Sequence, residues 1–217
     1  MTKKLNFHII TLFPKVFDDY TRESIIGRAK QKKKISISFY NPRDYTADKH
    51  KRVDRKPYGG GPGMVLEAIP ILSAAKKAVG RKKGVKVIFL TPSGKQFTNT
   101  HARKWARQYK DIVLISGHYE GVDARVKKAL KAEEISVGPY ILTGGEIPAM
   151  IIVDSVTRQL PGVLGNVSSL EEKRVSSSDV YTRPEEIVYK KKKYRVPKVL
   201  FSGDHKKVEE WRRKFTK

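Results

Sequence analysis

The sequence predicts an α/β fold in which a mainly parallel sheet is covered by helices on both faces. Two observations predict this fold. Apolar runs of strand length alternate with segments of helical periodicity. The alternation continues as far as residue 158, and strands that alternate with helices are typical of parallel sheets. A small, mostly helical C-terminal domain is expected to follow.

The first elements are predicted from apolar periodicity and from proline. Residues 7–13 are expected to form a strand that ends at Pro14, and residues 16–30 a helix. Residues 35–40 alternate apolar and polar side chains, as a strand with one buried face does. Residues 41–63 are expected to form a long polar loop, rich in charge and glycine.

The later elements continue the alternation, and their strands end at loops that contain glycine or proline. Helices are expected at residues 66–79, 99–109, 123–131 and 146–158. Strands are expected at residues 85–90, 112–116 and 134–137.

The periodic pattern ends after residue 164. Residues 165–180 are polar and serine-bearing, which predicts a flexible linker between a first domain over 1–164 and a second over 181–217. Between residues 190 and 217 there are 12 Lys/Arg against 3 Asp/Glu, and residues 206–214 predict a last helix. A unit this short buries little surface alone, so we expect it to pack on something else.

Charge is the strongest compositional signal. The 217 residues include 46 Lys/Arg and 22 Asp/Glu, a formal net charge of +24. Such a surface attracts polyanions, and nucleic acid is the leading partner. An anionic membrane surface is less favoured because no strongly amphipathic basic helix stands out. A lysine-rich surface that only maintains solubility is the remaining alternative.

Several classes of site are excluded or disfavoured by composition. The chain has no cysteine, which excludes disulfides, thiolate zinc sites and cysteine nucleophiles and fits a cytoplasmic protein. No apolar run approaches the roughly 20 residues of a membrane helix. The N-terminus lacks a small-residue cleavage site, so we expect a strand rather than a signal peptide there. No metal site is predicted, because the five histidines show no metal-ligand spacing.

Three glycine-bearing loops follow predicted strands, at residues 90–94, 116–121 and 137–146. In an open α/β sheet the loops at the carboxyl ends of the strands form the ligand crevice. Free backbone groups, glycines and two tyrosines suit a flat heterocycle held by main-chain hydrogen bonds. Residues 58–64 form a fourth glycine-rich loop that matches no phosphate-binding fingerprint. For any single loop, ordinary turn chemistry remains the alternative.

A series of short motifs is spread over nearly the whole chain. The motifs are LFP at 12–14, NPRD at 41–44, PYGGGPGM at 57–64, GHYEG at 117–121, LTGGE at 142–146, DSV at 154–156, PGVLG at 161–165 and YTRP at 181–184. Each motif is weak alone, but together and in this order they resemble the bacterial tRNA (guanine-N1)-methyltransferases of the TrmD type, which belong to the SPOUT methyltransferases.

The resemblance implies a function and an assembly. It implies methyl transfer from S-adenosylmethionine to N1 of guanine 37, the guanine directly 3′ of the anticodon. It also implies a homodimer, binding of the tRNA anticodon stem-loop, frequent dependence on Mg²⁺, and a trefoil knot in the cofactor region.

The resemblance further implies site residues. Arg158 is implied to stabilise charge on guanine O6, and the basic C-terminal unit to grip RNA. The implied cofactor-binding residues are Leu90, Thr91, Pro92, Gly117, Tyr119, Glu120, Gly121, Val137, Gly138, Pro139, Tyr140, Ile141, Leu142, Gly144, Gly145 and Pro148.

The sequence departs from the family where the general base is expected. Lys173 stands at the linker position where the family has an acidic residue. Its neighbour Glu172 is therefore expected as the base, with Asp179 as the alternative. Pro139 and Arg55 also replace aspartates that are usual in the family. A non-catalytic RNA-binding relative is thus a second hypothesis, and a ribosomal-type basic protein a third, which fits the charge but not the glycine loops.

Overall fold

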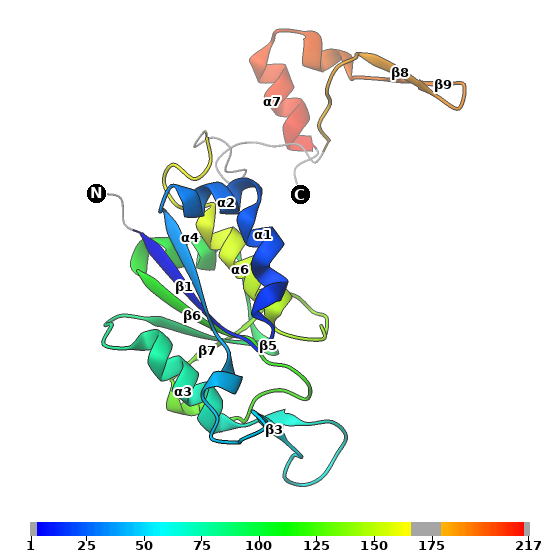
Figure 1. Cartoon of the computed structure of the whole chain (residues 1–217). Coiled ribbons are helices and arrows are strands. Elements are labelled where there is room, and N and C mark those ends of the chain that lie inside the picture. The colour runs from blue at the N-terminus through cyan, green and yellow to red at the C-terminus, as the bar shows by residue number, and fades with distance from the viewer. Residues whose placement is uncertain (1–3, 166–178, 215–217) are drawn as a thin grey trace. The chain divides into compact units, whose positions relative to one another are not determined.

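A computed structural model describes residues 4–165 and 179–214, in two compact units, Met1–Leu164 and Gly165–Lys217. The first unit contains a five-stranded sheet of order β2-β1-β6-β5-β7 in which every pairing is parallel (Figure 1). The parallel sheet predicted from the sequence is therefore confirmed. Its strands are β1 (Leu5–Ile10), β2 (Ile35–Tyr40), β5 (Lys86–Gln96), β6 (Asp111–Ile115) and β7 (Glu133–Ser136).

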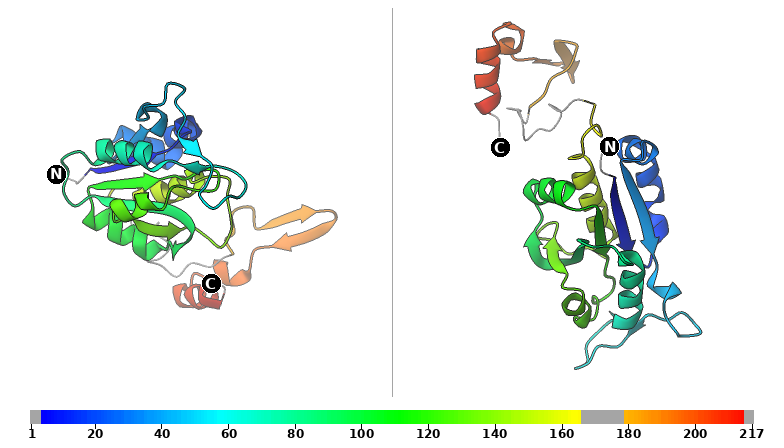
Figure 2. Two further views of the ribbon diagram at one scale, coloured as in Figure 1. Left: turned by 90° about the horizontal axis from the view of Figure 1, so that it is seen from below. Right: turned by 90° about the vertical axis from the view of Figure 1, so that its left-hand side faces the viewer.

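Helices cover both faces of this sheet, as predicted (Figure 2). The two faces are recognised by two separate clusters of buried side chains. One face packs against α2 (Ser24–Gln31), α4 (Asn99–Gln108) and α6 (Glu146–Thr157). The other packs against α3 (Ala68–Val79) and α5 (Arg125–Ala129).

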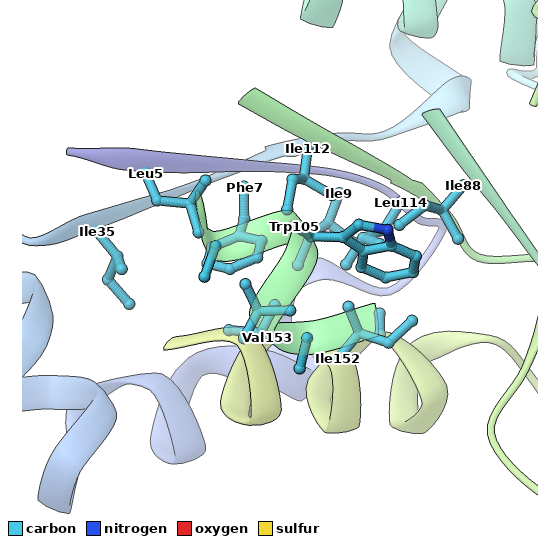
Figure 3. Packing of buried hydrophobic residues seen from close by; sticks show 14 of the residues in the cluster. Leu5, Phe7, Ile9, Ile35, Ile88, Trp105, Ile112, Leu114, Ile152 and Val153 are labelled. Carbon is cyan, nitrogen blue, oxygen red and sulfur yellow. The ribbon is translucent and has the colours of Figure 1, made fainter. Parts of the chain in front are cut away.

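The alternation of side chains along each strand produces the two clusters. In β1, Leu5, Phe7 and Ile9 point toward the face covered by α6, where Ile152 and Trp105 complete the packing (Figure 3). Each of these five side chains is at most 1% exposed. Burial of one such side chain stabilises the fold by about 1.5–3 kcal/mol, so this layer holds α6 firmly against the sheet.

The prediction of one continuous helix over residues 16–30 is wrong, because the chain forms three shorter helical pieces there. The chain forms η1 (Pro14–Phe17), α1 (Asp18–Arg22) and then α2. Glu23 between them is extended, with φ −97° and ψ 162°. A Cβ on Gly27 would lie 2.0 Å from the carbonyl oxygen of Arg22, so α2 crosses α1 closely enough to require glycine.

The strand predicted to stop before Thr91 continues as β5 to Gln96. Both Leu90 and Lys95 pair with Ile135 of β7, so residues 91–94 form a bulge and the chain then rejoins its neighbour. The predicted loop over residues 41–63 also contains η2 (Pro42–Asp44) and β3 (Asp54–Arg55), which pairs with β4 (Val65–Leu66). The trefoil knot stays a prediction.

The second unit contains a hairpin that sequence periodicity did not predict. Antiparallel strands β8 (Glu186–Tyr189) and β9 (Lys192–Arg195) precede η5 (Lys198–Phe201) and α7 (His205–Lys214). The expected mostly helical domain is thus a mixture of hairpin and helix. In its described part, 179–214, no side chain is buried. The predicted linker over 165–180 lies almost wholly outside the described residues.

Candidate cofactor and catalytic site

The three predicted loops line a cavity of about 320 Å³: the first lies at the bulge within β5, and the other two follow β6 and β7. These strands are neighbours in the sheet, so their carboxyl ends meet at one edge. That edge is where open α/β sheets bind ligands. The cavity is lined by Phe89, Leu90, Thr91, Pro92, Gly117, His118, Tyr119, Glu120, Gly121, Val122, Ile135, Ser136, Val137, Gly138, Tyr140, Ile141, Leu142, Thr143, Gly144, Gly145 and Pro148.

All the cofactor-binding residues expected from the sequence line this cavity, except Pro139. Pro139 is exposed between two lining residues, Gly138 and Tyr140. Several other lining residues, such as His118 and Ser136, were not predicted, although both lie within or beside the predicted loops. The three loops therefore form one continuous wall, while the role of each residue in binding stays a prediction.

A buried carboxylate ties two of these loops to the sheet. Glu146, the first residue of α6, is 5% exposed and accepts a hydrogen bond of 2.7 Å from the hydroxyl of Thr11. Its second oxygen lies 3.3 Å from Nε2 of His118, a lining residue that also forms an antiparallel bridge with Gly144. The acidic side chain at the helix N-terminus is further stabilised by the helix dipole.

Two glycines show where backbone rather than a side chain lines the cavity. Gly145 donates its N–H to the carbonyl of Gly117 at 2.9 Å, and a Cβ on Gly145 would lie 2.6 Å from Cα of Ser116. Glycine is therefore required where α6 begins. A Cβ on Gly117 would approach only Cγ2 of Val122, at 3.3 Å. At Gly117 the missing side chain leaves room for a ligand rather than for another part of the protein.

The fourth glycine-rich loop, residues 58–64, supports the cavity from outside. The amide of Glu120 donates to the carbonyl of Met64 at 3.0 Å, and a Cβ on Gly63 would lie 2.4 Å from the Glu120 carboxylate. Gly63 has φ +72°, a conformation that favours glycine. Tyr119, which lines the cavity, also adopts a positive φ of 59° and is 49% exposed.

Arg158 does not line this cavity. It follows α6 at the end opposite Glu146, and twelve residues of helix correspond to about 18 Å. In the last turn of α6, Asp154 accepts a hydrogen bond of 2.6 Å from the hydroxyl of Tyr20 on α1. Burial, together with this bond, raises the pKa of Tyr20 to about 12.

Both candidates for the general base belong to the second unit, Gly165–Lys217. Glu172 lies outside the described residues, and the same holds for Lys173. Asp179 is exposed and belongs to the second unit. Arg55 donates a hydrogen bond of 2.6 Å to Glu67. Within residues 4–165 and 179–214, no three His, Asp or Glu side chains form a group that could hold a metal ion.

None of the helices in the described ranges is long and apolar enough to span a membrane.

Comparison with known proteins identifies the family. The model of the family described as tRNA (guanine-1)-methyltransferase TrmD matches residues 5–217. A tRNA (guanine-N(1)-)-methyltransferase of Pseudoalteromonas atlantica is 44% identical, over 96% of this chain and 78% of the relative. The protein of that name from Clostridioides difficile is 43% identical, over 96% of this chain and 91% of the relative.

A solved structure points to the same family as the relatives found by sequence. The crystal structure of tRNA (m1G37) methyltransferase from Aquifex aeolicus superimposes with a TM-score of 0.78 and 36% identity, over 96% of this chain and 87% of that chain. The order of strands, the cavity at their carboxyl ends and these matches lead to one conclusion. The chain belongs to the tRNA (guanine-1)-methyltransferase TrmD family.

Proposed function

We propose that this chain transfers a methyl group from S-adenosylmethionine to N1 of guanine 37 in tRNA. The observation that carries the proposal is the cavity formed by the three strand-end loops, in a chain whose family and relatives are named for this reaction. Position 37 is the one that the similar Aquifex aeolicus enzyme, a tRNA (m1G37) methyltransferase, modifies. The net charge of +24 supports a polyanionic substrate.

The cavity fits S-adenosylmethionine in its chemistry. The backbone at Gly117 is open toward the cavity, and the rings of Tyr119 and Tyr140 are about half exposed at its wall. Exposed aromatic rings favour stacking with an adenine, and backbone groups can bind its polar edge. When bound, S-adenosylmethionine supplies the electrophilic methyl group.

The remaining chemistry falls to side chains of the protein. N1 of guanine carries a proton at neutral pH, so a base must accept this proton as the methyl group is attacked. We propose Glu172 for this role, with Asp179 as the alternative. Negative charge then develops on guanine O6, where the guanidinium of Arg158 can stabilise it.

We also propose that the active unit is a homodimer. Arg158 lies at the far end of α6 from the cavity of its own chain, so a cavity can be completed by Arg158 of the partner subunit. Exposed apolar side chains on neighbouring elements support an interface there: Val16 on η1 is 53% exposed and Ile147 on α6 is 49% exposed. A second copy that covers this face buries both side chains and adds the missing arginine.

The function is tested by incubating the protein with labelled S-adenosylmethionine and an unmodified tRNA transcript, with and without Mg²⁺. Incorporation of label, with 1-methylguanine recovered from the digested tRNA, is the expected result. Binding of tRNA without any incorporation, in either condition, would instead support the non-catalytic relative. We further propose that the protein acts in the cytoplasm, where tRNA and S-adenosylmethionine are both present.

A further inference from the structure

The β8–β9 hairpin has two chemically different faces. Its register pairs Ile187 with Tyr194 and Tyr189 with Lys192. Because side chains alternate along a strand, these four residues share one face, which we call the tyrosine face. The opposite face carries the pairs Glu186 with Arg195 and Val188 with Lys193.

The two faces carry the same formal net charge, but their charged side chains are paired differently. On the opposite face Glu186 accepts a hydrogen bond from Arg195 and pairs with Lys193 at 3.1 Å. The hydrogen bond from Arg195, followed by that from Lys193, lowers the pKa of Glu186 and keeps its carboxylate ionised. Both cations of this face are therefore engaged by one carboxylate. The tyrosine face has no carboxylate among its four residues.

On the tyrosine face, cations and aromatic rings are interleaved. Nζ of Lys192 lies 5.5 Å from the ring centroid of Tyr194, and Nζ of Lys190 lies 5.5 Å from that of Tyr189. Both rings remain accessible, since Tyr189 is 62% and Tyr194 46% exposed. A lysine above a ring makes only a weak contact at an exposed site, so a ligand can displace it at little cost.

The turn of the hairpin adds charge at a conformational cost. Lys190 and Lys191 connect the strands with φ of 49° and 61°. Two-residue turns of this kind favour Asn-Gly, because few side chains tolerate the left-handed region. Residues 190–193 at this tip are nonetheless four consecutive lysines, although glycine adopts a positive φ more readily than lysine.

We propose that the tyrosine face binds unpaired bases of RNA, with each tyrosine ring stacking on one base and the tip lysines neutralising the adjoining phosphates. Accessible rings within a field of positive charge are the features that bind single-stranded nucleic acid. Paired bases are already stacked and expose little of their faces, so a duplex uses only the lysines. The identification of this RNA as a tRNA rests on the function proposed above. The proposed stacking of bases on the tyrosine rings does not depend on that function.

The test uses the full chain and compares variants of the two faces. The variants Tyr189→Leu and Tyr194→Leu remove the rings and retain apolar bulk, while Tyr189→Phe retains the ring. Val188→Ala, on the opposite face, is the matched control. Dissociation constants are measured for unmodified tRNA, and for a single-stranded RNA and a duplex RNA of equal length. Circular dichroism and S-adenosylmethionine binding verify that each variant is folded.

Each Tyr→Leu variant is expected to weaken binding of tRNA and single-stranded RNA about tenfold. Binding of the duplex, binding of S-adenosylmethionine and the Tyr189→Phe and Val188→Ala variants should stay within about twofold. The double variant Lys190→Gln/Lys192→Gln should reduce the salt dependence of log K by about 1.4 on single strands. Equal affinity of the Tyr→Leu variants and the unchanged chain, or equal losses on both faces, would overturn the proposal.

The outcomes separate this proposal from the proposed function. If the unchanged chain methylates tRNA and the Tyr→Leu variants bind RNA normally, the tyrosine face is not an RNA site and the function stands. If the unchanged chain methylates nothing, but the Tyr→Leu variants lose affinity for single-stranded RNA, the function fails and the binding site stands.

Discussion

The hydroxyl of Thr11 donates a hydrogen bond of 2.7 Å to the carboxylate of Glu146, although the two residues lie 135 positions apart in the chain. Thr11 follows β1, which lies between β2 and β6 in the sheet, and Glu146 begins α6. The bond therefore joins the sheet to the helix whose first turn forms one side of the cavity. The same hydroxyl accepts a hydrogen bond of 3.0 Å from the amide of Phe13.

We expect Thr11→Val to lower the free energy of unfolding by about 1.5–3 kcal/mol, because the buried carboxylate loses a hydrogen bond that nothing replaces. Urea denaturation measures the change. Thr100→Val, on the exposed side of α4, should alter stability by no more than about 0.5 kcal/mol. Equal stability of the two variants would show that the bond between Thr11 and Glu146 contributes nothing measurable.

Gly117→Val tests the position of the cofactor. The added Cβ meets only Cγ2 of Val122, at 3.3 Å, and Gly117 lines the cavity, so the larger side chain is expected to occupy space that a ligand needs. We expect calorimetry to show at least a tenfold loss of S-adenosylmethionine affinity in a protein that still unfolds cooperatively. Gly165→Ala is the control, because a Cβ there has open space around it. Unchanged affinity of Gly117→Val would exclude a cofactor beside Gly117.

Shared active sites are tested by mixing two inactive variants. Arg158→Ala retains an intact cavity, and Gly117→Val retains an intact Arg158. Random exchange of subunits makes half of the dimers mixed, each with one complete site of two, so about a quarter of the original activity should return. Light scattering should show dimers throughout. If the mixture stays inactive while dimers are present, each cavity uses Arg158 of its own chain.

The general base is tested by three substitutions. We expect Glu172→Gln to slow single-turnover methylation at least about 100-fold with S-adenosylmethionine binding intact, since loss of a general base typically costs 10²–10⁴-fold. Asp179→Asn should slow it much less. Lys173→Asp tests the opposite case. If this variant methylates faster than the unchanged chain, the unchanged chain lacks a carboxylate that acts as the general base. Normal rates for both Glu172→Gln and Asp179→Asn would exclude both residues as the base.

The hydrogen bond between Tyr20 and Asp154 predicts a titration. Tyr20 retains its proton up to a pKa of about 12, whereas an unfolded tyrosine ionises near 10. Its contribution to stability is therefore complete below pH 10 and is lost as the pH rises through 12. Asp154→Asn should move the pKa partway toward 10, measured as tyrosinate absorbance relative to Tyr20→Phe. A pKa that stays near 12 would assign the whole shift to burial.

Local pattern predicted most of the fold, and the exceptions have identifiable causes. β2 was predicted over its observed bounds because alternation along a half-buried strand is a local signal. The break at Glu23 depends on the close approach of Gly27 to Arg22, a contact between two helices that periodicity does not register. The β8–β9 hairpin was missed because its turn uses Lys190 and Lys191 where sequence rules expect asparagine and glycine.

The sequence predicts the three loops of the candidate site, but not the contacts that hold these loops together. Glycine-bearing loops after strands indicate a crevice, and the resemblance assigned residues within it. The bond from Thr11 to Glu146 links segments at opposite ends of the first unit, so no local pattern announces it. The distance of Arg158 from its own cavity becomes evident only when α6 is placed on the sheet, and this distance favours a site shared between two chains.

The most direct test of the proposed function is the site of methylation on the RNA. Unmodified tRNA transcripts with guanine or adenine at position 37 are incubated with the protein and labelled S-adenosylmethionine, and the modified nucleoside is identified by mass spectrometry. The proposed function predicts 1-methylguanine in the guanine transcript and no label in the adenine transcript. Label of equal intensity in both transcripts, or none in either while tRNA and S-adenosylmethionine both bind, would contradict it.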